Sequence, residues 1–147
     1  MGDTLDDFVN DIEEQIYQET KEAYGEIAFQ RWLNPLFMGS MDNPDGYASL
    51  RGVCGDTMEI FLKFERSRVK DASFLSSGCG SSSVCASFAA ELSLRKTPDE
   101  ILAITAEDIM EKLGGLPKED EHLAFLAAET LHQAVNDHSL KKATERK

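Results

Sequence analysis

Cys79 is the residue best placed for chemistry, because it stands between two glycines in the stretch from Ser76 to Glu91. The residues before it alternate as in a strand and those after it follow a helical period, which predicts a strand-to-helix turn. The unpaired N–H groups and the positive dipole end of the new helix favour a thiolate there. Such a thiolate would be a nucleophile or a soft-metal ligand, although a buried structural cysteine beside a small-residue turn fits the same residues.

A second cysteine opens the sequence Cys54-Gly55-Asp56 at the end of another expected strand. This strand and the one before Cys79 run the same way if a single intervening strand pairs with both. The two turns then emerge at the same edge of the sheet, where two thiols and a carboxylate can meet. With an imidazole added, such a donor set suits zinc or an iron–sulfur unit rather than a hard ion such as magnesium.

The remaining cysteine and the histidines give weaker signals. Cys85 falls inside an apolar helix, which favours core packing. His122 opens the last long helix, and a histidine in such a charged stretch is commonly a solvated surface residue. We expect His132 and His138 to be exposed to solvent. Spacing alone does not decide the site, because Cys54 and Cys79 are 25 residues apart and match no generic zinc motif.

The elements that must position these residues are strands followed by helices. Alternating side chains predict three strands, at about 47–53, 57–64 and 69–75, whose short connections give an antiparallel meander. Helical patterns follow over residues 80–96, after the capping box Thr97-Pro98-Asp99-Glu100, over 109–113 and over 119–142. This order predicts an α+β fold, a three-stranded antiparallel sheet with helices packed on one face.

An amphipathic helix is expected before the sheet, from Thr4 to about Glu22. Its apolar residues recur at helical spacing and are Leu5, Phe8, Val9, Ile12 and Ile16. Gly25 interrupts this pattern before a further turn or two that Asn34-Pro35 ends, so the two segments form one kinked helix or two. An uncovered stripe of this size would leave a large apolar patch in water, so we expect the domain or a second copy to cover it.

Composition excludes several classes of function. The 147 residues suffice for one domain with a real core. No apolar run approaches a membrane span and the acidic N-terminus lacks a secretory apolar segment, so we expect a cytoplasmic protein without a membrane partner. A net charge of −12 opposes phosphate binding and argues against nucleic acid as a partner. Three cysteines in a chain that needs no disulfides favour reduced thiols for metal or sulfur chemistry.

Several motifs in the correct order resemble the IscU/NifU family of iron–sulfur cluster scaffold proteins. They are Tyr24-Gly25-Glu26-Ile27, Trp32-Leu33-Asn34-Pro35, Met38-Gly39-Ser40, Cys54-Gly55-Asp56, Gly78-Cys79-Gly80-Ser81, Thr97-Pro98-Asp99-Glu100 and Leu116-Pro117. The resemblance implies an N-terminal helical extension (residues 1–23) and a NifU-like scaffold domain (residues 24–147). It also implies a SufE/NifU-like sheet with helices on one side, which agrees with the strand and helix patterns.

The function implied by this resemblance is that of a non-enzymatic scaffold or carrier. Family members receive sulfur from a cysteine desulfurase, assemble a [2Fe-2S] cluster and pass it to apo iron–sulfur proteins. Carried over residue by residue, the cluster-site residues are Cys54, Asp56, Cys79 and His122. Thiolates bind iron tightly, whereas a carboxylate or imidazole can release it. One chain offers only two candidate thiolates, so a homodimer that shares one cluster is a further possibility.

Two departures from the family pattern keep other functions open. The family has a third cysteine directly after the histidine, where this chain has Leu123, and the segment that recruits a chaperone in some members is acidic here, at Glu119 and Asp120. One alternative is a protein that holds Zn2+ and relays persulfide sulfur through Cys54 or Cys79. Another is a metal-free adaptor of the assembly machinery. The presence of all four candidate ligands argues against complete decay of the site.

Overall fold

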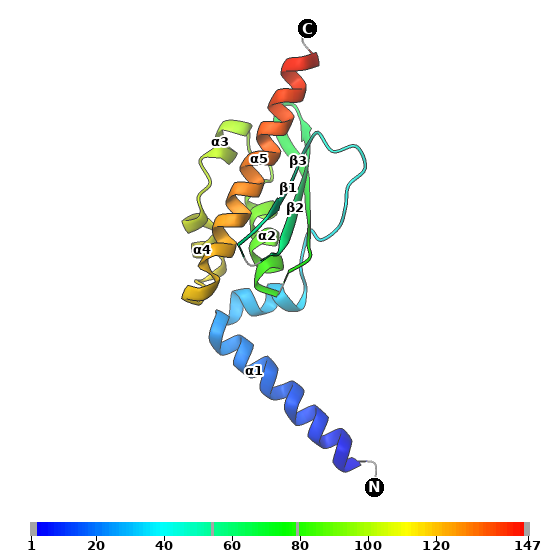
Figure 1. The fold of residues 1–147 in the computed structure, drawn as a ribbon, viewed down its shortest axis with the longest axis vertical. Helices are drawn as coiled ribbons and strands as arrows, with labels where there is room; N and C mark the ends of the chain where they lie inside the picture. The colour runs from blue at the N-terminus through cyan, green and yellow to red at the C-terminus, as the bar shows by residue number, and fades with distance from the viewer. Residues whose placement is uncertain (1–2, 54, 79, 146–147) are drawn as a thin grey trace.

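The computed structural model describes residues 3–53, 55–78 and 80–145. Its elements in chain order are α1 (Asp3–Leu33), β1 (Gly46–Arg51), β2 (Thr57–Glu65), β3 (Arg68–Ser76), α2 (Gly80–Ser93), α3 (Pro98–Leu102), α4 (Ala106–Leu113), the 3-10 helix η1 (Lys118–Asp120) and α5 (Glu121–Glu145). The strands form one antiparallel sheet in the order β1-β2-β3, and the helices that follow cover one of its faces (Figure 1). The predicted α+β fold is confirmed.

The register of the sheet brings the C-terminal ends of β1 and β3 to the same edge. Arg51 at the end of β1 pairs with Thr57 at the start of β2, and the next residue, Met58, pairs with Ser76 at the end of β3. Neighbouring strands lie about 4.8 Å apart, so the two outer strands end about 10 Å from each other. The turns after β1 and β3 therefore leave the sheet side by side, as the meander predicts.

The core lies between the sheet and helices α2 and α5. Met58, Ile60 and Leu62 point inward from β2 and are fully buried, as their alternation predicts. The helix α5 approaches β1 so closely that a Cβ on Gly46 would lie 2.3 Å from the carbonyl oxygen of Ala134. This close contact between backbones fixes α5, and with it the segment that precedes α5, against the sheet.

The helix α1 is bent at Gly25, whose φ of 83° and ψ of 170° lie outside the helical region. After Gly25 the helix packs on the domain, where Ala28 is buried. The guanidinium of Arg31 lies 3.9 Å from the centre of the Phe88 ring and pairs with Glu91 at 2.7 Å. Before Gly25 the helix extends away from the sheet (Figure 1). Of the two arrangements that the sequence left open, one kinked helix or two helices, the structure shows the kinked helix.

The apolar stripe on the first part of α1 is not covered by the domain in the part of the chain that the structure describes. Phe8 is 61% exposed, Val9 44% and Ile12 40%. The side chains of Leu5 and Ile16 lie outside the described residues. The expectation that the domain itself covers this stripe is wrong for Phe8, Val9 and Ile12, because the bend at Gly25 directs the helix away from the core.

The ends of the shorter helices follow local sequence signals. Thr97 and Glu100 form the predicted capping box of α3, and Thr105 and Asp108 form a second one at α4. The helix α4 ends at Gly114, whose φ of 90° is the left-handed conformation that favours glycine. None of the helices that the structure describes combines the length and the apolar character needed to cross a bilayer.

Candidate functional site

The turns that carry Cys54 and Cys79 are joined to each other at the edge of the sheet. Both cysteines lie outside the described residues, so the geometry of the site rests on their neighbours. The Ser77 N–H donates to the Thr57 carbonyl oxygen at 3.0 Å, and the Thr57 N–H donates to Ser77 Oγ at 3.0 Å. The segments that follow Cys54 and precede Cys79 are thus held together by a reciprocal pair of hydrogen bonds.

Asp56 lies against the residue that precedes Cys79. A Cβ on Gly78 would stand 2.5 Å from both Cγ and Oδ2 of Asp56, which is closer than real Cβ atoms approach. Only glycine leaves room for this carboxylate at position 78. The turn that carries Asp56 is closed by a hydrogen bond of 2.8 Å from the Gly52 N–H to the Asp56 carbonyl oxygen. The structure therefore brings one predicted ligand, Asp56, to the backbone beside another, Cys79.

On the other side of Cys79, Gly80 accommodates Trp32. A Cβ on Gly80 would lie 2.0 Å from Nε1 of the indole, so any side chain there would displace the ring. Trp32 itself stacks on Phe29, with ring centroids 6.0 Å apart. Sequence reasoning missed Trp32 as part of the site. The signal that could have found it is the second glycine, since a glycine that opens a helix must have a steric or conformational reason.

The start of α2 is tied to the segment that holds His122. Ser81 Oγ donates to Asp120 Oδ2 at 3.3 Å, and Asp120 stands two residues before His122 in the chain. His122 is half-buried in the first turn of α5. Asp120 is a second carboxylate near the Cys79 turn that sequence reasoning did not propose. Its acidic neighbourhood was visible in the sequence, but its pairing with Ser81 depends on the fold.

Serine hydroxyl groups connect the segments on the two sides of Cys79. Ser76 Oγ accepts from the Gly78 N–H at 3.2 Å and lies 2.8 Å from Ser82 Oγ. Ser82 is fully buried. The end of β3 and the start of α2 are therefore connected across the turn by two serine side chains.

The ligand set stays a prediction. Among the described residues, no group of three or more His, Cys, Asp and Glu side chains is placed to hold a metal ion. The described residues do not include Cys54 and Cys79, which supply both thiolates of the expected set Cys54, Asp56, Cys79 and His122. The donor types fit the proposed cargo, because two thiolates with a carboxylate and an imidazole are established ligands of iron–sulfur units and of zinc.

Other candidates lie away from the site. Cys85 is fully buried in the core, as predicted. Leu123 is 2% exposed, so the side chain at the position of the third family cysteine belongs to the core. His132 and His138 were expected to be exposed, but both are half-buried. His132 Nε2 lies 2.7 Å from the Ile104 carbonyl oxygen, and His138 stacks on a phenylalanine ring of β2.

The chain is similar in sequence to proteins of known family. Residues 23–145 match the family model described as the NifU-like N terminal domain. The chain is 36% identical over 119 residues to the iron-sulfur cluster assembly scaffold protein IscU 1 of Archaeoglobus fulgidus. This match covers 80% of this chain and 78% of that protein. It is 34% identical over 125 residues to the iron-sulfur cluster assembly scaffold protein IscU of Escherichia coli, with 82% and 97% covered.

A solved structure shows the same fold. The N-terminal part of a nitrogen-fixing NifU-like protein from Brucella abortus superposes with a TM-score of 0.65 and covers 83% of this chain and 98% of that one. The two are 18% identical, so this likeness concerns the fold alone. The family match and the relatives above 30% identity show that the chain belongs to the NifU-like N-terminal domain family.

Proposed function

We propose that this protein is a scaffold that assembles a labile [2Fe-2S] cluster and carries it as cargo. It accepts sulfur from a cysteine desulfurase and passes the cluster to apo iron–sulfur proteins, without itself being an enzyme. Membership of the NifU-like family and the scaffold names of its relatives support this function.

The observation that carries the proposal is the contact between Asp56 and Gly78. The Asp56 carboxylate lies against the residue that precedes Cys79 in the chain, which links the segment after Cys54 to the segment before Cys79. Asp56 itself stands two residues after Cys54. We therefore expect this part of the sheet edge to combine strong thiolate donors with an oxygen donor that exchanges more readily.

The chemistry of these donors suits a carrier rather than a permanent cluster protein. Stable [2Fe-2S] clusters commonly have four thiolate ligands, whereas this chain supplies two at the site. Asp56 and His122 would complete the set, and weaker ligands let the cargo leave. The site residues Cys54, Asp56, Cys79 and His122 therefore hold the cluster for transfer.

The test is cluster assembly under anaerobic conditions with ferrous iron, cysteine, a cysteine desulfurase and a thiol reductant, which supplies the electrons that convert persulfide sulfur into sulfide. We expect visible absorption of a [2Fe-2S] cluster, with iron and acid-labile sulfide in matching amounts. Cys54→Ser and Cys79→Ser should each remove nearly all of it, because serine is a poor replacement for a thiolate ligand of iron. The third cysteine gives a matched control, since Cys85→Ala changes a thiol in the core and should leave the cluster unchanged.

A second function is favoured by one observation, the burial of Leu123 at the position of the third family cysteine. The four remaining donors are also a complete set for one tetrahedral zinc ion. In that case Cys54 or Cys79 would attack the outer sulfur of the desulfurase persulfide, take over that sulfur and release the desulfurase thiolate. One zinc per chain without visible absorption after reconstitution would favour this relay. No bound metal would leave the metal-free adaptor.

A further inference from the structure

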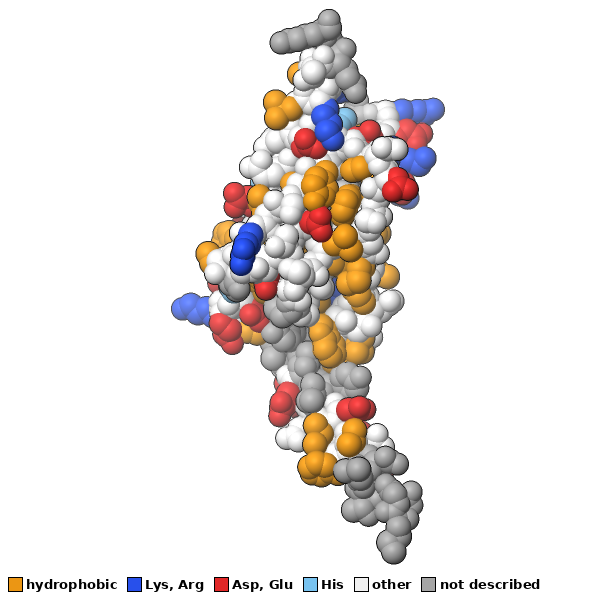
Figure 2. Space-filling model, turned by 45° about the vertical axis from the view of Figure 1, so that its right-hand side comes forward, with side chains coloured by type: hydrophobic (Ala, Val, Ile, Leu, Met, Phe, Trp, Pro, Cys, Tyr) orange, Lys and Arg blue, Asp and Glu red, His pale blue; other side chains and the backbone are white. Residues whose placement is uncertain are grey.

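The first part of α1 is an acidic amphipathic helix. Between Asp3 and Tyr24 the chain has eight acidic residues and one lysine, a net charge of −7 within a total of −12. At 100° per residue, Asp11 and Glu22 border one side of the apolar stripe and Glu13 the other. Figure 2 shows hydrophobic side chains exposed on this protruding helix, with acidic ones close by. The segment thus has one apolar face between two negative borders.

A second copy of the chain is a poor occupant for this stripe. Two such helices would bring net charges of −7 together within one Debye length, about 8 Å at physiological salt. Charge complementarity favours a hydrophobic groove bordered by lysine and arginine on a different protein.

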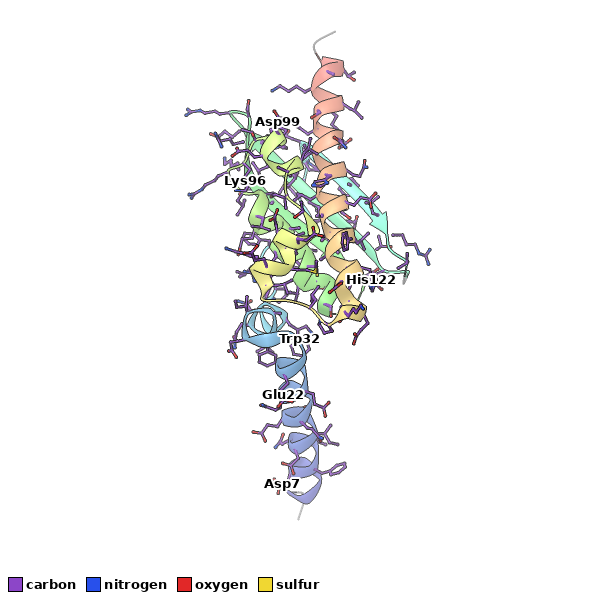
Figure 3. All side chains as sticks on the ribbon, turned by 90° about the vertical axis from the view of Figure 1, so that its left-hand side faces the viewer. Asp7, Glu22, Trp32, Lys96, Asp99 and His122 are labelled. Atoms are coloured by element: carbon purple, nitrogen blue, oxygen red, sulfur yellow. The ribbon has the colours of Figure 1, made fainter. Side chains whose placement is uncertain are left out.

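The helix leaves the domain at the end that carries the candidate site. In Figure 3 Trp32 and His122 lie at this end, and Glu22 and Asp7 follow at increasing distance from the domain. Trp32 connects the two directly, because it belongs to α1 and lies against Gly80. A protein bound to the helix therefore lies on the side of the domain that carries the Cys79 turn.

We propose that this acidic helix is the docking element for the sulfur donor, and that its apolar stripe occupies a hydrophobic groove with basic borders on the desulfurase. The inference rests on the proposed function. A scaffold takes sulfur from one donor protein but passes clusters to many recipient proteins. A single docking helix is therefore better matched to binding the one donor than to binding the varied recipients. Docking of this kind raises the effective concentration of the donor at the site, typically to the millimolar range for a short connection.

The test is binding of the full chain to the purified cysteine desulfurase at about 50 mM and about 300 mM salt. Removing the apolar anchors with Phe8→Ser and Ile12→Ser should weaken binding about tenfold or more, as loss of buried anchors does. Neutralising the borders with Asp11→Asn, Glu13→Gln and Glu22→Gln should weaken binding severalfold at low salt and flatten its salt dependence.

Matched controls are available on the folded domain. Leu140→Ser removes an apolar side chain that is 69% exposed on α5. Glu107→Gln with Glu111→Gln removes two exposed charges from α4. Both controls should bind the desulfurase as the unmodified chain does. All changed positions on α1 are exposed, so circular dichroism should show the same helical content throughout.

Docking and cluster chemistry can be separated with inorganic sulfide. Cluster assembly from ferrous iron and sulfide needs no donor protein, so the α1 variants should perform it like the unmodified chain and should lag only when the desulfurase and cysteine supply the sulfur. Failure of the unmodified chain with inorganic sulfide would contradict the proposed function. The docking proposal is overturned if the α1 variants bind the desulfurase normally, if the unmodified chain does not bind it, or if the stripe instead holds a homodimer together.

Discussion

The two turns at the site differ in how firmly the rest of the molecule holds them. The turn after β3 receives Asp56 against Gly78 and Trp32 against Gly80. The turn after β1 is held at its two ends, where Gly52 lies against Leu126 of α5 and Asp56 against Gly78, but Val53 and Gly55 are exposed. Gly55 has a φ of 87°, and a Cβ there would lie 3.5 Å from the guanidinium of Arg51. Val53 is 92% exposed.

The difference indicates that the two turns have different roles in the site. Side chains from α1, from the β1–β2 turn and from η1 contact residues on both sides of Cys79, namely Gly78, Gly80 and Ser81. The Cys54 turn is open to solvent on the side of Val53, where a partner protein can approach. An enclosed turn beside a more accessible one suits a site that must both retain cargo and exchange it.

The largest expected effect comes from filling the space at Gly80. Gly80→Ala should destabilise the protein by about 3 kcal/mol, because a Cβ there would overlap the Trp32 indole and force it out of place. Urea unfolding measures this loss. In a Trp32→Ala background the same change should cost at least about 1 kcal/mol less, since the clash has been removed. Equal costs in both backgrounds would show that Trp32 does not hold the turn.

The next effect tests whether α5 can supply a ligand to the fixed turn. Leu123→Cys should cost about 2 kcal/mol in unfolding free energy, because it removes buried carbon atoms from the core. It should not lengthen the lifetime of the cluster against a chelator, since the side chain at this position is directed into the core. A clearly longer lifetime would mean that the new thiol reaches the site and that the burial of Leu123 is not decisive.

A smaller effect separates the two turns most directly. Gly78→Ala should cost about 1 to 2 kcal/mol and shorten the cluster lifetime, because its Cβ would push the Asp56 carboxylate away. Gly55→Ala should cost about 1 kcal/mol through its positive φ and leave the lifetime unchanged. Chelator competition with both variants gives the comparison. If the two variants lose the cluster equally fast, the position of Asp56 against Gly78 is not what matters.

Most of the fold could be predicted because its signals are local. Alternation along β2 and the capping box at Thr97 each depend on a few neighbouring residues, and both are confirmed. The candidate site was predicted less completely. The sequence placed Asp56 near the Cys79 turn through strand direction, but it did not reveal Trp32 or Asp120, whose contacts join residues far apart in the chain.

The N-terminal helix shows the limit of pattern reasoning. Its apolar stripe predicted a buried face, but the pattern alone does not say whether the cover belongs to the same chain. The positive φ of Gly25 decides this, because it turns the first segment away from the domain. The exposure of His132 and His138 was predicted wrongly for a related reason, since their partners, Ile104 and Phe64, come from other elements.

The smallest expected effect provides a baseline away from both turns. Thr97→Ala removes the hydroxyl that accepts from the Glu100 N–H at 3.3 Å and should cost about 1 kcal/mol. Asp99 of the same helix lies at the opposite end of the domain from Trp32 and His122 (Figure 3). The cluster lifetime should therefore be unchanged in Thr97→Ala. A shorter lifetime would mean that any loss of stability weakens the site. The comparison of Gly78→Ala with Gly55→Ala would then no longer distinguish the two turns.

The same cap predicts a pH dependence with a definite sign. The Thr97 backbone N–H donates to Glu100 at 3.0 Å, and this bond, with that of the Thr97 side chain, lowers the pKa of Glu100 below its usual 4.5. A lowered pKa in the folded protein means that the Glu100 carboxylate stabilises the fold above about pH 4.5, and that this contribution is lost as the pH falls through the folded pKa. Glu100→Gln, which does not titrate, should be less stable than the unmodified chain at pH 7, and the difference should vanish in strong acid. A difference that stays constant across this range, measured by urea unfolding, would show that the carboxylate charge does not support the cap.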